Sequence, residues 1–548
     1  MSTDPEFTVS GVIAQTLARH LRHCFGLMGN GNAYLLDALA GTDVPFVAVR
    51  HEAGAVVAAD AYYRACGRIA AATTTYGAGY TNTVTALAEA VRARTPLLLV
   101  TGDQPSTGAR PWDVDQPGIA AAVGARTFVV GTDDAAAMTV AALQYALDHR
   151  APVVLSIPYD LAAAGAGVQP TAAELIMPAP LAPDRTQIPA LAGILDRAQH
   201  PLVLAGRGAW LSGASDVLAR LAHRIGALTA TSAGAPGVIG PAPDGLEVDL
   251  GICGGFADDD AAKLINSADV VLVAGARLNP FTMRHQTALG SDATVIQLDL
   301  ADQATHPSVS HYLRGDVRLS AEALLAELGD APVHRWRDRA ANRSRHRDPG
   351  TGLAADGRLD PRSVAYRLNQ LLPADRTVVS DGGHFIGWAP TYWDLPEPNR
   401  LILVGTEFQA IGMGFPSAVG AAAALPESTV VLTTGDGGGL MALADLDSMI
   451  RTVRRGVVVV WNDGYYGAEL HQYGSLGLST APMRIRTADF AALGRALGAA
   501  GAVINTPDDL DQLARWLDAG SDGVFVADCR VSPHIRAPYM TTQLSLTS

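Results

Sequence analysis

Residues 428–439, which read STVVLTTGDGGG, decide how this chain is expected to fold. The run up to Thr434 is typical of a buried strand, and a helical pattern follows over Leu440–Val453. Glycines between them let a backbone approach phosphate oxygens closely, and the start of the next helix offers N–H groups and the positive end of its dipole. This order predicts a phosphate-binding turn in which Asp436 can hold a hard cation.

A second turn rich in oxygen atoms follows the next strand along the chain. The apolar run Val457–Trp461 ends in Asn462-Asp463-Gly464. Because ligand sites in parallel α/β sheets lie beyond the carboxyl ends of the strands, we expect both turns to face one ion. Asp436, the Asn462 amide oxygen, the Gly464 carbonyl and two diphosphate oxygens would together suit Mg²⁺.

The segment Gly435-Asp436-Gly437, followed after 24 residues by Asn462, is similar to the GDG(x)nN signature of thiamine-diphosphate (ThDP) enzymes. The resemblance, above all to the acetohydroxyacid synthase branch, extends over nearly the whole chain. It implies that Asp436, Asn462 and Gly464 bind Mg²⁺ and that the diphosphate lies against Gly435, Gly437 and Gly438. An ordinary glycine-rich turn between a strand and a helix is the alternative.

Glu52 is the candidate for the carboxylate that activates the cofactor. It lies in Arg50-His51-Glu52-Ala53-Gly54-Ala55 after the strand-like Pro45–Val49, and it begins an Ala-rich helix that runs to about Cys66. This segment resembles the RHExGA sequence of acetohydroxyacid synthase relatives. The resemblance implies that Glu52 binds N1′ of the aminopyrimidine ring, whose imino nitrogen then removes the C2 proton. Taken alone, a Glu at this position is also explained by the helix dipole.

Three more segments resemble cofactor-binding parts of the family. In residues 409–420, QAIGMGFPSAVG, alignment on Pro416 puts Ile411 where a side chain props the two cofactor rings, with Met413 as second choice. Residues 75–82, TYGAGYTN, resemble the loop that borders the ring site, where Gly77 suits a close approach. Further candidates for cofactor contacts follow the second metal turn: Tyr465, Tyr466 and Gly467.

Three other side chains are candidates for proton transfer or substrate contacts. Asn30 lies in residues 25–32, FGLMGNGN, a loop that lines the substrate pocket in relatives, although turn formation explains it equally well. His384 follows a strand-like run, and is expected either to shuttle protons near neutrality or to donate a hydrogen bond to the diphosphate. Glu469 stands one residue from the position of a catalytic Glu in some decarboxylases.

The expected fold class is α/β, with three doubly wound parallel-sheet domains. A chain of 548 residues is too long for one core, and short β-branched runs such as Leu97–Thr101 and Val270–Ala274 alternate with Ala-rich helical segments. Linkers are predicted at about residues 162–187 and 331–356. The predicted domains are a pyrimidine-binding domain at 1–170, a central domain at 188–330, and a diphosphate- and Mg²⁺-binding domain at 357–540.

Composition narrows the classes of partner. The formal net charge of −14 argues against nucleic acid or an anionic membrane as a partner. The basic stretch Arg335–Arg347 is interpreted as a solvated linker. Residues 1–8 show no signal-peptide pattern and no apolar run is long enough to span a bilayer, so a soluble cytoplasmic protein is predicted. The four cysteines are scattered, which indicates neither a disulfide framework nor a zinc site.

The resemblance implies a ThDP- and Mg²⁺-dependent lyase or carboligase acting on a 2-oxo acid or a related small carbonyl compound. Two alternatives stay open: a hydrolase of carbon–carbon bonds in a cyclic or 1,2-dicarbonyl compound, and a ThDP-binding homologue without catalysis. FAD or a nucleotide occupies the central domain in some relatives, but the glycines of this domain alone do not support FAD here. Family precedent brings Glu52 and Asp436 together from two subunits, which implies at least a homodimer and, by that precedent, a homotetramer.

The chain also departs from the family's best-known branches. Asp103 stands where true acetohydroxyacid synthases have Gln, and Pro111–Asp115 replaces their loop with Phe and Lys. Gln104-Pro105 replaces the His pair of simple pyruvate-type decarboxylases. These differences leave the reaction itself undecided, because fold and cofactor do not select it.

Overall fold

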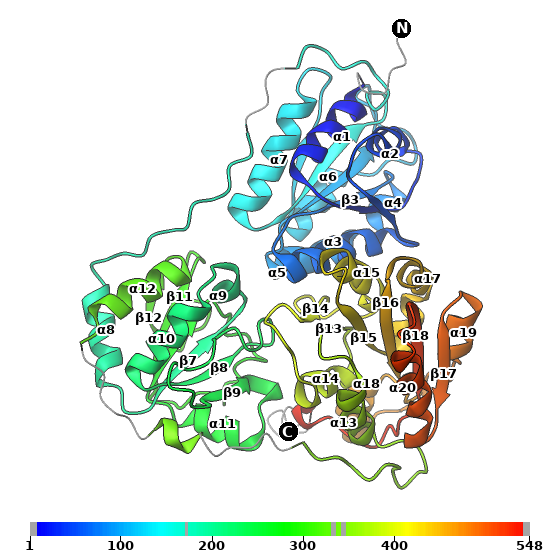
Figure 1. The fold of residues 1–548 in the computed structure, drawn as a ribbon. Coiled ribbons are helices and arrows are strands. Elements are labelled where there is room, and N and C mark those ends of the chain that lie inside the picture. The colour runs from blue at the N-terminus through cyan, green and yellow to red at the C-terminus, as the bar shows by residue number, and fades with distance from the viewer. Residues whose placement is uncertain (1–7, 170–173, 330–335, 341–346, 541–548) are drawn as a thin grey trace.

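The computed structural model describes residues 8–169, 174–329, 336–340 and 347–540. It contains three six-stranded sheets in which every strand pairing is parallel. Each sheet has a hydrophobic core on both faces, where helices cover it (Figure 1). The predicted fold class is therefore confirmed. Among the described helices, none is long and apolar enough to cross a bilayer.

The N-terminal unit, blue to cyan in Figure 1, has the strand order β2-β1-β3-β4-β6-β5. Its strands are β1 (Cys24–Gly26), β2 (Phe46–Ala48), β3 (Ala71–Thr74), β4 (Leu97–Asp103), β5 (Arg126–Val129) and β6 (Pro152–Pro158). Its helices are α1 (Val9–His20), α2 (Ala33–Ala40), α3 (Glu52–Cys66), α4 (Ala78–Thr81), α5 (Val84–Ala93), α6 (Gln116–Val123) and α7 (Ala135–His149).

The central unit, green in Figure 1, has the strand order β12-β11-β10-β7-β8-β9. Its strands are β7 (Pro201–Ala205), β8 (Leu228–Thr231), β9 (Asp249–Ile252), β10 (Val270–Ala274), β11 (Thr294–Asp299) and β12 (Val309–Arg314). Its helices are α8 (Ile188–Arg197), α9 (Arg207–Leu211), α10 (Ser215–Ile225), α11 (Asp259–Asn266) and α12 (Val317–Glu327).

The C-terminal unit, yellow-green to red in Figure 1, has the strand order β14-β13-β15-β16-β18-β17. Its strands are β13 (Arg376–Ser380), β14 (Leu401–Leu403), β15 (Thr429–Gly435), β16 (Arg455–Trp461), β17 (Ala500–Ile504) and β18 (Gly523–Cys529). Its helices are α13 (Pro361–Leu371), α14 (Trp388–Tyr392), α15 (Gly414–Ala424), α16 (Asp436–Met441), α17 (Leu443–Thr452), α18 (Gly467–Gln472), α19 (Phe490–Ala496) and α20 (Asp511–Asp518). Short 3-10 helices complete the three units: η2 (Gly254–Phe256), η3 (Arg337–Arg339), η4 (His384–Gly387), η5 (Gly474–Leu476), η6 (Ala481–Met483) and η7 (Pro507–Leu510).

The two outer units share one topology and one core. Counted from its own first strand, each has the order 2-1-3-4-6-5, whereas the central unit has the doubly wound order 3-2-1-4-5-6. Helices α3 and α15 lie side by side between the outer units (Figure 1) and contribute to a single hydrophobic cluster. They cross so closely that a Cβ at Gly420 would lie 2.0 Å from the Ala58 carbonyl oxygen. This packing fixes how the outer units sit relative to each other.

Two expectations need correction. The helix after the glycine turn starts at Asp436 rather than at Leu440, so Gly437, Gly438 and Gly439 are helical. The helix breaks at Ala442 into α16 and α17. Within the basic stretch, Arg337 is not solvated. Its side chain is buried and pairs with Asp244, with an N–O distance of 2.6 Å, because its guanidinium needs a counter-charge there. Residues 1–7, Arg335 and residues 341–346 lie outside the described residues.

Candidate active site

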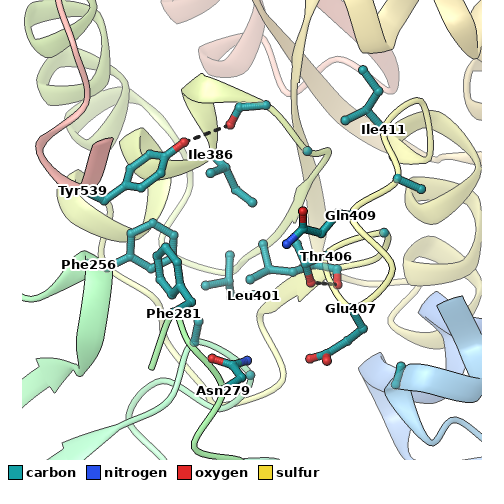
Figure 2. A pocket seen from close by; sticks show the side chains of 18 of the residues that line it. Phe256, Asn279, Phe281, Ile386, Leu401, Thr406, Glu407, Gln409, Ile411 and Tyr539 are labelled. Carbon is teal, nitrogen blue, oxygen red and sulfur yellow. Dashed lines mark hydrogen bonds between the residues drawn. The ribbon is translucent and has the colours of Figure 1, made fainter. Parts of the chain in front are cut away.

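A cavity of about 680 Å³ lies where the three units meet (Figure 2). The central and C-terminal units form most of its wall, and the N-terminal unit completes it with Arg64, Ala93, Arg94 and Arg150. Its walls include the segments that follow β7, β10, β13, β15 and β16, which is where parallel α/β sheets form ligand sites. Many of the residues predicted for the site line it: His384, Ile411, Gly435, Asp436, Gly437, Gly438, Tyr465, Tyr466, Gly467 and Glu469. The cavity therefore unites the predicted phosphate-binding turn with the predicted substrate contacts of the same unit.

Asp436 lies at the bottom of this site as the first residue of α16. Only 1% of it is exposed, and its carboxylate accepts hydrogen bonds from the N–H groups of Gly437 (3.1 Å) and Gly464 (3.0 Å). Burial raises the pKa of Asp436 to about 6. Burial, together with the nearby Asp436, raises the pKa of Asp463 to about 7. A buried and a half-buried carboxyl group that oppose each other's ionisation make a place where a cation would be stabilised.

Asn462 presents an oxygen atom to the same region. The residue is fully buried, and its Nδ2 donates to Asp528 Oδ1 (2.9 Å) and to the Ala488 carbonyl (3.1 Å), which fixes the amide plane. No donor among the described residues reaches Asn462 Oδ1. A buried acceptor without a donor is costly, and a hard cation would satisfy it. The residues present therefore fit Mg²⁺.

Gly464 contributes differently from the expectation. Its N–H bonds Asp436, and its carbonyl, the predicted metal ligand, accepts a hydrogen bond from the Ile485 N–H (2.8 Å). Only the second lone pair of that carbonyl is left for an ion.

Three charged residues that were not among the predicted site residues hold this site in place. Asp528 fixes the Asn462 amide, and Arg358 donates to the carbonyls of Asn462 and Asp463, both at 2.8 Å. Asp381, 1% exposed, accepts from the N–H groups of Gly382, Gly412 and Met413 and from the Thr434 hydroxyl. For the two aspartates, the sequence offered a signal: an acidic residue in or directly after an otherwise apolar strand, as in GVFVADC at 523–529.

His384 is held as a neutral imidazole. Its Nε2 accepts from the Ala537 N–H at 2.8 Å, so its proton resides on Nδ1. Burial, with smaller contributions from His471 and Arg536, lowers the pKa of His384 to about 3. A shuttle that titrates near neutrality is therefore not supported, whereas the alternative of a neutral hydrogen-bond donor fits this geometry.

The two candidates for the propping side chain are separated by the fold. Ile411 lines the cavity, at whose edge Figure 2 labels it. Met413 is 5% exposed and belongs instead to the core shared by the outer units, so the second choice does not reach the cavity. Glu469 lines the cavity from α18 as an exposed side chain.

The candidates from the N-terminal unit form a separate group that does not line this cavity. Glu52 starts α3 after its cap His51, and its Oε2 accepts from Asn82 Nδ2 at 2.9 Å. Asn30 is exposed and donates to the Tyr76 hydroxyl (2.9 Å), and the Gly77 N–H donates to Gln116 Oε1 (2.7 Å). Within one chain, the structure does not bring Glu52 and Asp436 into one cavity.

Known proteins match all three units. The models of the thiamine pyrophosphate enzyme match residues 7–120 (N-terminal TPP binding domain), 188–324 (central domain) and 381–529 (C-terminal TPP binding domain). A probable 2-ketoarginine decarboxylase of Pseudomonas aeruginosa is 28% identical over 97% of this chain and 95% of its own length. The acetolactate synthase isozyme 3 large subunit of Escherichia coli is 27% identical over 91% of this chain and 90% of its own length.

A solved structure supports the same fold. The thiamine diphosphate-dependent 4-hydroxybenzoylformate decarboxylase of Rhodococcus jostii RHA1 matches with a TM-score of 0.79 at 22% identity, covering 96% of this chain and 99% of that one. With three domain models and full-length relatives of one kind, the chain belongs to the thiamine pyrophosphate enzyme family, in its acetolactate synthase-like branch, and is a ThDP-dependent enzyme.

Proposed function

We propose that this protein uses ThDP and Mg²⁺ to decarboxylate a 2-oxo acid, as a lyase or as a carboligase that joins the product to a second carbonyl compound. The observation that carries the proposal is the pair Asp436 and Asn462. Both are buried, they directly follow the paired ends of β15 and β16, and Asn462 Oδ1 has no donor among the described residues. Full-length similarity to a probable decarboxylase and to acetolactate synthases supports it.

When bound, ThDP supplies the carbon nucleophile and the electron sink that carbon–carbon cleavage next to a carbonyl requires. Asp436 and Asn462 would hold Mg²⁺, with the second lone pair of the Gly464 carbonyl as a third ligand, and the backbone of Gly435–Gly438 would lie against the diphosphate. His384 stays neutral near pH 7, so it would donate a hydrogen bond from Nδ1 to the diphosphate there.

Three further side chains would complete the chemistry. Ile411 would support the two rings from the cavity wall, and Glu469, exposed in the cavity, would move a proton to or from the substrate. Glu52 would exchange a proton with the aminopyrimidine ring. Since Glu52 is not in the cavity of its own chain, this role requires a second subunit.

Exposed apolar side chains support such self-association. In the N-terminal unit Met28, beside Asn30 in the chain, is 65% exposed, and Trp112, whose carbonyl approaches Gly77, is 62% exposed. Met441, at the end of α16 in the C-terminal unit, is 60% exposed. Large exposed apolar side chains near functional residues are typical of protein interfaces. These three lie in the two units that carry the half-sites, by which we mean the Glu52 region of the N-terminal unit and the Asp436 region of the C-terminal unit. We therefore propose a homodimer as the smallest active unit, and a homotetramer by family precedent.

The cavity wall indicates the kind of substrate. Phe256 and Phe281 of the central unit pack with ring centroids 4.6 Å apart, and Tyr539 of the C-terminal unit lies 5.9 Å from each (Figure 2). Ile386 and Leu401 extend this apolar wall. Apolar lining stabilises apolar substrate groups by excluding water from them. A 2-oxo acid with a bulky apolar or aromatic side chain is therefore proposed over pyruvate.

The test is turnover of a panel of 2-oxo acids and 1,2-diones by the protein with ThDP and Mg²⁺, with CO₂ release and product mass recorded. We expect CO₂ from bulky 2-oxo acids, loss of activity on chelation of Mg²⁺, and a fall in kcat of roughly 10²–10⁴-fold in Glu52→Gln. Ring opening without CO₂ would identify a hydrolase instead. Tight ThDP binding without turnover of any substrate would identify a non-catalytic homologue.

A further inference from the structure

The segment 403–411, which connects the end of β14 to Ile411, holds one non-glycine residue, Gln409, in the left-handed region of the backbone. Gly405 has φ 102° and Gln409 has φ 56°, and Gly412 follows with φ 79°. A non-glycine residue such as Gln409 in the left-handed region persists only where surrounding contacts determine it. Figure 2 shows Glu407, Gln409 and Ile411 along the cavity wall. The contacts that determine this segment therefore bear on the cofactor site.

The N-terminal unit holds the segment at two points through buried charges. Glu89 on α5 is fully buried, and its Oε2 accepts from the Phe408 N–H at 2.7 Å. Its other oxygen, Oε1, accepts from Arg64 Nη2 of α3 at 2.9 Å. Arg64 in turn donates to the Leu403 carbonyl and is paired with both oxygens of Asp60 at 2.7 and 2.9 Å. One carboxylate thus connects the start of the segment, through Arg64, with Phe408 near its end.

The charges of this cluster are firmly maintained. Burial by itself would lower the pKa of Arg64, but the attraction and hydrogen bonds of Asp60 and Glu89 raise it above its ordinary value. A buried ion pair of this kind adds little net stability compared with apolar packing, so its presence points to a specific geometric task.

Two other contacts complete the hold on Ile411. Arg277, after β10 of the central unit, pairs with Glu407 at 2.8 Å. On the far side, Asp381 accepts from the N–H groups of Gly412 and Met413 at 3.0 and 3.2 Å. Because the Arg277–Glu407 pair is half-exposed, we expect it to contribute little to holding the segment. The buried Glu89 is therefore the main determinant on the Phe408 side.

We infer that Glu89 is a positioning residue: with Arg64 it fixes the segment 403–411 and so holds Ile411 at the site where the proposed function puts the cofactor rings. The inference rests on that proposed function. The alternative is that Glu89 only joins two units. The two roles predict different effects of a mutation. Loss of a contact that only joins two units would lower stability without a selective loss of ThDP affinity.

Glu89→Gln is the sharpest test. The carboxylate accepts from two donors on two oxygens, whereas Gln has a single oxygen, so one of the donors of Arg64 or Phe408 would face an N–H₂ group. We expect the dissociation constant for ThDP, titrated by protein fluorescence with Mg²⁺ present, to rise roughly tenfold, as for loss of a buried hydrogen bond to a charged group. We also expect kcat to fall by a similar factor, while KM for the 2-oxo acid changes less than about twofold.

Asn399→Ala is the matched control. Asn399 Nδ2 donates to the Ala65 carbonyl at 2.6 Å, so it joins the same two units just before β14 but does not touch the segment. It should bind ThDP with wild-type affinity. Arg64→Lys keeps the charge, but the lysine cannot reach the Leu403 carbonyl together with both carboxylates. We expect it to weaken ThDP binding and lower kcat as Glu89→Gln does, so it serves as the test if Glu89→Gln does not fold.

Wild-type ThDP affinity and kcat in either folded variant, or an equal loss in Asn399→Ala, would overturn the inference. Failure of the wild-type protein to bind ThDP would instead refute the proposed function, so the two failures are distinguishable.

Discussion

His384 and His471 lie with ring centroids 4.5 Å apart, and both are buried as neutral imidazoles. Burial, then His471 and Arg536, lowers the pKa of His384 to about 3, and burial, then Arg536, lowers that of His471 to about 4. In the unfolded chain both titrate at about 6.5. Below that pH the unfolded chain takes up protons that the folded chain does not, so both residues lower stability as the pH falls from about 6.5 toward 4.

The prediction at this scale is that the melting temperature falls between about pH 7 and pH 5, and that the fall is smaller in His471→Gln. The difference in slope isolates the histidine from the carboxyl groups, which titrate in both proteins. His311→Gln, at an exposed position on β12, should keep the wild-type slope. Parallel slopes for wild type and His471→Gln would refute the assignment of a neutral buried imidazole.

At the scale of elements, the turn from β15 into α16 depends on glycines because it packs against another loop of the same unit. A Cβ at Gly438 would lie 2.6 Å from Asp381 Oδ2, the carboxylate that holds Gly412 and Met413. We predict that Gly438→Ala costs about 1–3 kcal/mol of stability, as overpacking does, and weakens ThDP binding. Thermal unfolding and fluorescence titration would measure the two effects.

Gly193→Ala serves as the control for this prediction. It lies within α8, where an added Cβ meets only the flexible end of Arg197 at 3.3 Å. Because Ala is more favourable than Gly in a helix by about 1 kcal/mol, the melting temperature of Gly193→Ala should equal or exceed that of the wild type. If Gly438→Ala were also as stable as the wild type, close packing at the turn would not be the reason for the glycine.

At the scale of the whole molecule, the two half-sites belong to units whose relative position is fixed by α3 and α15. We predict that Glu52→Gln and Asp436→Asn proteins, each inactive alone, regain activity when their subunits are exchanged. The expected level is about a quarter of wild type, because half of the random dimers are mixed and one of the two sites in each is intact.

Light scattering of the same samples gives the oligomeric state. Restored activity in a dimer or tetramer would support a site shared between subunits. A fully active monomer, or no recovery after verified subunit exchange, would show that each chain completes its own site.

Much of the fold could be predicted because it follows local patterns. The observed α3 runs from Glu52 to Cys66 and β10 from Val270 to Ala274, as predicted, because alternation of apolar runs and Ala-rich stretches reports burial directly. The start of α16 was missed because glycines are poor helix formers, and only packing around Asp436 makes them helical. The hydrogen bond from Ile485 to the Gly464 carbonyl and the role of Arg358 could not be predicted because they depend on contacts with residues distant in the sequence.

Residue types at short spacing were enough to predict the α/β class, the glycine-rich strand-to-helix turn at Asp436, the start of α3 at Glu52 and the resemblance to ThDP enzymes. Which of the candidate residues meet depends on long-range packing. It brought His384, Ile411 and Glu469 to the cavity with Asp436, placed Met413 in a core, and kept Glu52 apart. It also lowered the pKa of His384 and placed Glu89 against Phe408. Burial and contacts over hundreds of residues decide these properties, and no local pattern encodes them.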